Sequence, residues 1–143
     1  DATRELARKM GETGGTDRLL SDGAYNIRLG SYYLTSLIEK FNGSYVLAAA
    51  AYNGGPGRVA RWVDEIGDPR SPSTPIARYM KGRKPGESEH WMAMDVIETY
   101  PFGETRFYIH QVLAGLQIYR AIMGKDHTTR LTLRSNLTGC NAC

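Results

Sequence analysis

Hydrophobic residues recur at helical intervals along most of the chain, and almost nothing alternates with the period of two that marks a strand. The first helical stretch runs from Ala2 to Met10, where Gly11 ends it. A longer stretch of about five turns lies between a possible N-cap at Asp22 and the terminating pair 42–43. One buried stripe is expected on it, formed by Ile27, Leu34, Leu37, Ile38 and Phe41. The pattern predicts an all-α fold.

The next predicted helix contains the run Ala48 to Ala51, and Ser44 is placed to cap it. Alanine has the smallest helix-forming side chain, so neighbouring helices can approach this one closely and we expect it to be central. Residues 53–55, Asn-Gly-Gly, break the helix, and Pro56 is suited to begin another. The apolar face of that following helix consists of Val59, Trp62, Val63 and Ile66.

A final helix is expected to begin near Gly103 or Glu104 and to end at Gly124. Its apolar positions are Ile109, Val112, Leu113, Leu116, Tyr119 and Met123. Residues 12–22 and 67–89 are rich in polar residues and glycine, so both are expected to be connections. The sequence thus predicts one helical domain over 1–124, followed by a loosely held polar tail over 125–143.

Composition agrees with a single globular domain. The 143 residues are 41% hydrophobic and 23% charged, with a net charge of +3. No basic cluster marks a nucleic-acid partner, and the longest apolar run, 46–52, is too short to span a membrane. The chain opens at Asp1 without a signal-peptide pattern. Cys140 and Cys143 fit a short disulfide, a redox motif or half of a metal site. The histidines do not form a metal spacing, and no cofactor is expected.

The turn at the end of the alanine-rich helix is the first candidate functional site. In residues 51–59 the helix ends at Tyr52 and Asn53, so a phenol and an amide are presented beside Gly54 and Gly55. Glycines allow positive φ and close approach of a ligand to the backbone. These groups suit the hydroxyls and acetamides of a sugar. The alternative is a purely structural corner, with Tyr52 in the core and Asn53 as a C-cap.

The second candidate lies at the start of the final helix, in residues 100–108. Glu104 falls in the first helical turn, where the helix dipole favours an acidic side chain. In the functional interpretation Glu104 lies at the floor of a cleft, with Arg106 and Tyr108 nearby. In the structural interpretation Glu104 serves the dipole, Arg106 forms a surface ion pair and Tyr108 belongs to the core.

Together these segments, with residues 25–34, resemble the catalytic domain of the bacterial soluble lytic transglycosylases, and the likeness covers about Ala2 to Met123. The resemblance implies a goose-lysozyme-like fold and cleavage of the β-1,4 bond between N-acetylmuramic acid and N-acetylglucosamine in peptidoglycan, leaving 1,6-anhydro ends. It further implies a supporting catalytic role for Tyr52 and Glu104, substrate binding by Asn53, Gly54, Gly55 and Tyr108, and a location in the periplasm or cell envelope.

One departure from the family pattern concerns the general acid. In the family the catalytic glutamate precedes a Gly-Leu-Met-Gln segment and a Met-Pro pair, and both lie upstream of the stretch that matches Ala2 to Met10. We therefore expect the acid and the first helices to lie upstream of Asp1, so that this chain alone is inactive and associates through apolar surface. The alternatives are a non-catalytic glycan-binding module, a hydrolytic lysozyme and a helical protein-interaction domain.

Overall fold

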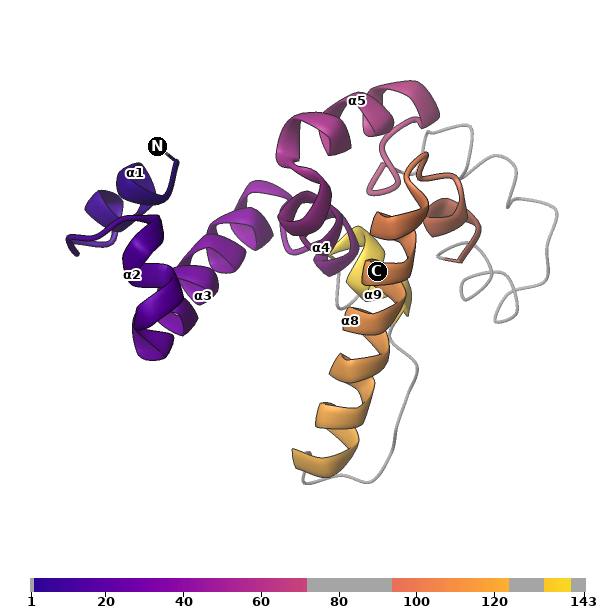
Figure 1. Cartoon of the computed structure of the whole chain (residues 1–143). Helices are drawn as coiled ribbons and strands as arrows, with labels where there is room; N and C mark the ends of the chain where they lie inside the picture. The colour runs from indigo at the N-terminus through magenta and orange to yellow at the C-terminus, as the bar shows by residue number, and fades with distance from the viewer. Residues whose placement is uncertain (1, 72–93, 124–132, 140–143) are drawn as a thin grey trace, which may run out of the picture.

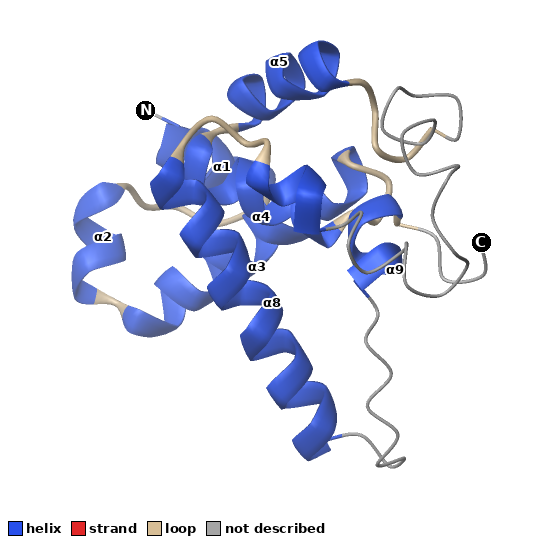
Figure 2. Cartoon of the chain, turned by 90° about the vertical axis from the view of Figure 1, so that its right-hand side faces the viewer, coloured by secondary structure: helices blue, strands red, loops and turns tan. Residues whose placement is uncertain are grey.

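A computed structural model describes residues 2–71, 94–123 and 133–139. In this part of the chain every regular element is a helix and none is a strand, which confirms the all-α prediction there (Figure 2). The elements are α1 (Ala2–Lys9), α2 (Thr16–Ser21), α3 (Gly23–Lys40), α4 (Tyr45–Gly54), α5 (Pro56–Ile66), α8 (Gly103–Met123) and α9 (Leu133–Thr138), and residues 94–98 are also helical.

Helix α4 lies at the centre, in contact with α3, α5, α8 and α9 (Figure 1). The side chains from Val46 to Ala51 are at most 3% exposed, so nearly every face of this helix is covered. The distance between packed helices depends on the side chains at the contact, and alanine permits a short one. The predicted central position of the alanine-rich helix is confirmed.

Ser44 begins α4 and also fixes α9 against it. Its hydroxyl oxygen accepts a hydrogen bond from the backbone N–H of Leu47 at 3.3 Å, which confirms the predicted cap. The same hydroxyl donates to the carbonyl of Leu137 in α9. Since Ser44 is fully buried, both of its bonds are formed away from water.

The prediction of a loosely held tail is wrong for residues 133–139. Leu137 is fully buried and belongs to the main hydrophobic core, and Asn136 is only 1% exposed. The few leucines of this polar segment give little periodic signal, yet α9 lies in contact with α4 through the buried Leu137. The rest of the tail, with Cys140 and Cys143, and most of the connection expected over 67–89 lie outside the described residues.

Helix α3 has Asp22 as its N-cap, as predicted, but its buried positions differ from the expected stripe. Leu37 and Phe41 are buried, whereas Ile27 is 71% exposed and Leu34 38% exposed. The reason is that α3 belongs to two cores. Its second half packs in the main core, while Tyr25 and Leu29 form a smaller core with α1. Ile27 lies about 200° around the helix from each of those two residues, so it faces solvent.

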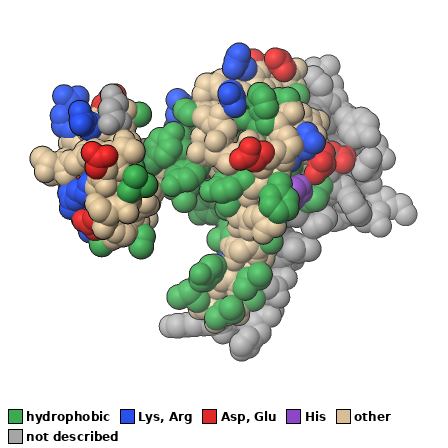
Figure 3. Space-filling model, viewed as in Figure 1, with side chains coloured by type: hydrophobic (Ala, Val, Ile, Leu, Met, Phe, Trp, Pro, Cys, Tyr) green, Lys and Arg blue, Asp and Glu red, His purple; other side chains and the backbone are tan. Residues whose placement is uncertain are grey.

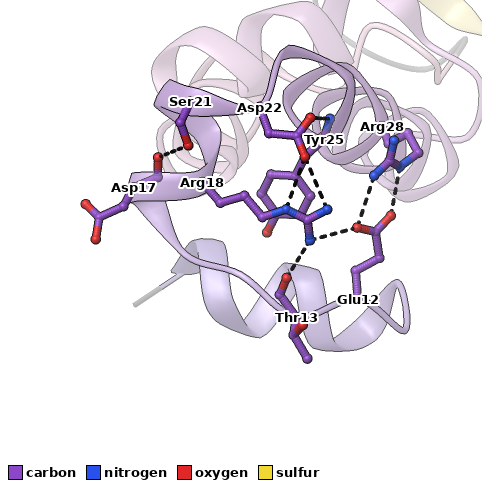
Figure 4. Close-up of polar contacts among 8 residues, drawn as sticks. All are labelled: Glu12, Thr13, Asp17, Arg18, Ser21, Asp22, Tyr25 and Arg28. Carbon is purple, nitrogen blue, oxygen red and sulfur yellow. Dashed lines mark hydrogen bonds and ion pairs between the residues drawn. The ribbon is translucent and has the colours of Figure 1, made fainter.

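The segment 12–22, expected to be a connection, contains α2. Arg18 holds this short helix in place because its guanidinium pairs with Glu12 and Asp22 and stacks 4.1 Å from the centre of the Tyr25 ring. Glu12 also receives two hydrogen bonds from Arg28 of α3 (Figure 4). Contacts with residues outside α2 thus hold the helix, although its own sequence, next to two glycines, gives no helical signal.

Helix α8 confirms the predicted final helix, with Ile109 and Leu113 buried. The last turns of α8 differ from the prediction. Tyr119 and Met123 were expected on the buried apolar stripe of this helix, but they are 67% and 76% exposed. Among the described residues this end of α8 therefore presents apolar side chains to solvent, and the expected association through surface left by missing first helices stays a prediction. No helix of the described residues is long and apolar enough to cross a membrane.

Replacing Ser44 with alanine removes the cap of α4 and its bond to α9. We expect the Ser44→Ala variant to lose about 1–2 kcal/mol of unfolding free energy, measured by urea denaturation. Ser31→Ala is the matched control, because Ser31 is exposed in α3 and its replacement should change stability by less than about 0.5 kcal/mol. Equal stability of the two variants would contradict the role of Ser44.

Acid is expected to loosen α1 and α2 from α3. Hydrogen bonds from Arg28 hold the pKa of Glu12 below its ordinary value of 4.5, and the backbone N–H of Tyr25 holds the pKa of Asp22 below 3.8. Both carboxylates therefore contribute stability above these ordinary values, and the contribution is lost as the pH falls through the lowered ones.

The thermal midpoint of the native chain should accordingly fall below about pH 4.5. The variant carrying Glu12→Gln and Asp22→Asn should start less stable and show a shallower fall over the same range. Glu5→Gln serves as the control, since Glu5 forms only an exposed pair with Lys9. Parallel curves for the native chain and the double variant would exclude this explanation.

Candidate functional site

The turn between α4 and α5 has the predicted construction. Gly55 adopts a φ of +90°, and its backbone N–H donates to the carbonyl of Ala51 at 2.9 Å, which closes the end of α4. Pro56 is the first residue of α5 and needs no backbone donor there. Tyr52, Asn53 and Gly54 thus form the last turn of a helix whose preceding turns are buried, so their positions are well fixed.

Tyr52 leaves the core and faces α3. Its side chain is 39% exposed, so the purely structural interpretation, with Tyr52 in the core, is not what the structure shows. The ring centre lies 5.5 Å from that of Tyr33, at a tilt of 40°. A Cβ atom added at Gly30 would lie 3.1 Å from the Tyr52 hydroxyl, so the glycine makes room for the phenol.

A cavity of about 340 Å³ lies beside these tyrosines. Its wall comes from three N-terminal helices and from Tyr52, through Ala2, Thr3, Leu6, Leu19, Asn26, Leu29, Gly30, Tyr33 and Tyr52. The space-filling view shows a hollow between the α1–α2 end and the body around α4, with hydrophobic side chains on both sides (Figure 3). The cavity therefore lies where the small core meets the main one.

A hydrogen bond between Asn53 and Thr105 joins the two candidate motifs. The Thr105 hydroxyl donates to Oδ1 of Asn53 at 2.6 Å across 52 positions of sequence. Gly54 lies against the same region, because an added Cβ would be 3.2 Å from the Thr105 hydroxyl and 2.8 Å from the hydroxyl of Tyr100. The end of α4 and the start of α8 are thus packed directly on one another.

Tyr100 is a fully buried support of this junction. Its ring lies edge-on to Trp62, with centres 4.8 Å apart. Burial raises the pKa of its phenol, and the hydroxyl has no hydrogen-bond partner among the described residues. Arg106 forms the predicted ion pair, since it lies 3.7 Å from Glu98. It also donates a hydrogen bond to the Tyr100 carbonyl at 2.7 Å.

Glu104 lies in the first turn of α8, as predicted, and its side chain is exposed. It is not among the residues that line the cavity, and within the described part of the chain it has neither a hydrogen bond nor an ion pair. Glu104 therefore directly precedes Thr105 of the junction in the sequence, but it does not lie at the floor of this cavity. Its catalytic role stays a prediction.

Tyr108 follows Glu104 by one helical turn and is partly buried against the main core. Burial raises the pKa of its phenol, and the neighbouring Tyr52 raises it further. The two tyrosines named from separate motifs are therefore neighbours in space. This agrees with both the structural and the functional interpretation of Tyr108.

Sequence reasoning missed three members of this site: Gly30, Tyr33 and Thr105. Gly30 and Tyr33 lie in the recognisable stretch 25–34, but nothing in their spacing indicates that they meet Tyr52. Thr105 lies inside the second motif, between two charged residues that drew the chemical interpretation. Among the described residues no group of acidic, histidine or cysteine side chains could hold a metal. The described site offers phenols, an amide and aromatic faces, which suit a neutral, polyhydroxylated ligand.

Comparison with known proteins shows which proteins this chain is similar to. Residues 1–71 match the model of the transglycosylase SLT domain. The chain is 33% identical over 109 residues to the soluble lytic murein transglycosylase of Escherichia coli K12. It is 34% identical over 100 residues to the Salmonella typhimurium protein of that name. These matches cover 76% and 70% of this chain but only 14% and 12% of those relatives.

A solved structure is similar over most of the chain. It is the X-ray structure of lytic transglycosylase Slt from Pseudomonas aeruginosa, an inactive mutant in which a glutamate is replaced by glutamine. The TM-score is 0.60 at 34% identity, over 92% of this chain and 18% of that one. The neighbour is a protein of the lysozyme-like fold, in agreement with the fold expected from the sequence.

Substitutions at the glycines around the turn should test how tightly this junction is packed. Gly54→Ala would bring a methyl group into the Tyr100 hydroxyl, so we expect a loss of about 1–3 kcal/mol in unfolding free energy. Gly57→Ala, in open space within α5, should raise it by about 0.5–1 kcal/mol. Chemical denaturation measures both, and a neutral Gly54→Ala would show that the junction is loosely packed.

Proposed function

Since the chain belongs to the transglycosylase SLT domain family, we propose that it supplies the peptidoglycan-binding part of a lytic transglycosylase in the cell envelope. The observation that carries this proposal is the junction of the two motifs, in which Asn53 of α4 is bonded to Thr105 of α8. The junction brings an exposed amide, the Tyr52 and Tyr108 phenols and the exposed Glu104 to the same end of the main core.

The proposed reaction cleaves the β-1,4 bond between N-acetylmuramic acid and N-acetylglucosamine. A carboxylic acid protonates the departing O4 oxygen as the bond from C1 breaks, and the positive charge develops on the sugar ring. The carboxylate then takes the proton of the sugar's own C6 hydroxyl, whose oxygen forms the new bond to C1. The product is a 1,6-anhydro ring, and water is not consumed, unlike in the two-carboxylate scheme of ordinary glycosidases.

We propose that the acid is a glutamate N-terminal to Asp1. No acidic side chain is among the described residues that line the cavity, and Glu104 is exposed on α8 outside this lining. Ala2 and Thr3 form part of the cavity wall, so residues that precede them would arrive beside Tyr52. The inactive Pseudomonas mutant, with glutamine in place of a glutamate, supports the need for such a residue.

Mass spectrometry of the products tests this division of labour. Incubation of the 143-residue chain with purified peptidoglycan is expected to give binding without soluble muropeptides, because the acid is not supplied. Release of 1,6-anhydro muropeptides would refute the upstream acid. If release then stopped in the Glu104→Gln variant, Glu104 would be the acid. Glu39→Gln is the matched control, because Glu39 is an exposed residue of α3.

The same incubation distinguishes the other functions. Muropeptides with reducing ends would indicate a hydrolytic lysozyme. Binding without product, also when the upstream segment of a longer relative is attached, would indicate a glycan-binding module. Absence of any binding to peptidoglycan would contradict the proposal and favour a protein-interaction domain.

A further inference from the structure

The ligand chemistry of the site depends on which way the Asn53 amide is turned. We propose that Thr105 is a positioning residue that fixes this amide so that its Nδ2 group, a hydrogen-bond donor, is offered to the ligand. The site would thereby select N-acetylated over de-N-acetylated glycan. The orientation stands on the structure itself, whereas the identity of the ligand rests on the proposed function.

The length of the bond supports this orientation. An asparagine amide can contact a hydroxyl through its oxygen or through its nitrogen. The contact is 2.6 Å long, which lies in the range of O–H···O bonds, about 2.5–3.0 Å, and below the usual range of N–H···O bonds, about 2.7–3.2 Å. The Thr105 hydroxyl therefore donates to the amide oxygen, and the Nδ2 group is directed away from Thr105.

Thr105 is suited to hold the amide because its own side chain is packed in the protein interior. It is 3% exposed in the first turn of α8, next to the packed contact between Gly54 and Tyr100. Asn53, by contrast, is exposed at the end of α4, and its Nδ2 group has no partner among the described residues. A buried hydroxyl thus fixes one end of an amide whose other end is accessible.

An amide that presents only donors requires an acceptor on the ligand. The carbonyl oxygen of an acetamido group is such an acceptor. The ammonium group left by removal of the acetyl group has only donors and a positive charge. A site built to form a polar bond discriminates strongly against a ligand that leaves that bond unformed. The Thr105–Asn53 pair is therefore expected to favour glycan that has an acetamido acceptor over glycan that has an ammonium group.

The contact between Thr105 and residue 53, on which the orientation depends, can be tested without any ligand. In the Asn53→Asp variant, the Thr105 hydroxyl would donate to a carboxylate, which lowers the carboxyl pKa. NMR titration should give a pKa about one unit lower in Asn53→Asp than in Asn53→Asp combined with Thr105→Val. Thr35→Val is the matched control, because Thr35 is an exposed residue of α3 whose hydroxyl donates to the backbone carbonyl of Ser31. Equal pKa values with and without the Thr105 hydroxyl would show that it does not bond to residue 53, and this would overturn the positioning role of Thr105.

The selectivity is tested by binding to purified glycan strands and to the same strands after chemical de-N-acetylation. The preference of the native chain for N-acetylated strands should fall about three- to tenfold in Thr105→Val and be retained in Thr105→Ser. Comparing the preference between variants removes the general effect of charge on the strands. Asn53→Ala, on the exposed side, gives the same test should Thr105→Val fail to fold.

The outcomes separate the inference from the function on which it rests. Binding with an unchanged preference in folded Thr105→Val or in Asn53→Ala would overturn the selectivity. Failure of the native chain to bind either strand would instead contradict the proposed function and, with it, the selectivity. The titration of Asn53→Asp would still decide whether the Thr105 hydroxyl bonds to residue 53.

Discussion

The burial of α4 on nearly all sides is the constraint on which the rest of the structure depends. A helix surrounded by four others must have small side chains where the neighbours come closest, and the run Ala48 to Ala51 provides them. Its exit from the core is equally constrained, because Gly55 reverses the backbone and Pro56 starts the next helix at once. The residues of the last turn therefore have little freedom, and that turn carries Tyr52 and Asn53.

Local signals in the sequence predicted the elements whose causes are local. Ser44 and Asp22 cap their helices because capping needs only a side-chain oxygen at the right position, and Pro56 starts α5 for a similar reason. The errors lie where contacts with residues outside the element decide. Helix α2 depends on the Arg18 contacts, Leu137 on α4 and the exposure of Ile27 on the division of α3 between two cores.

The same distinction applies to the site. The motif residues Tyr52, Asn53 and Tyr108 were predictable because their sequence context is specific. Their partners were not, since Thr105 meets Asn53 across 52 positions and Tyr33 meets Tyr52 from another helix. A sequence reports which groups are available, whereas the direction in which an amide is turned follows from the packing around it. Glu104 shows the converse, since its position on α8 was predicted and its absence from the cavity lining was not.

The two cores differ in what holds them, and the cavity lies between them. The main core combines α4 with the apolar faces of α3, α5, α8 and α9, whereas the small core has only three fully buried apolar residues. The small core therefore relies on the charged network of Arg18 and Arg28, whose contribution is screened by salt and lost in acid. Local stability follows buried apolar contacts. The wall formed by α1 and α2 should thus open before the wall formed by Tyr52, so that the cavity can change shape while the Asn53–Thr105 junction stays fixed.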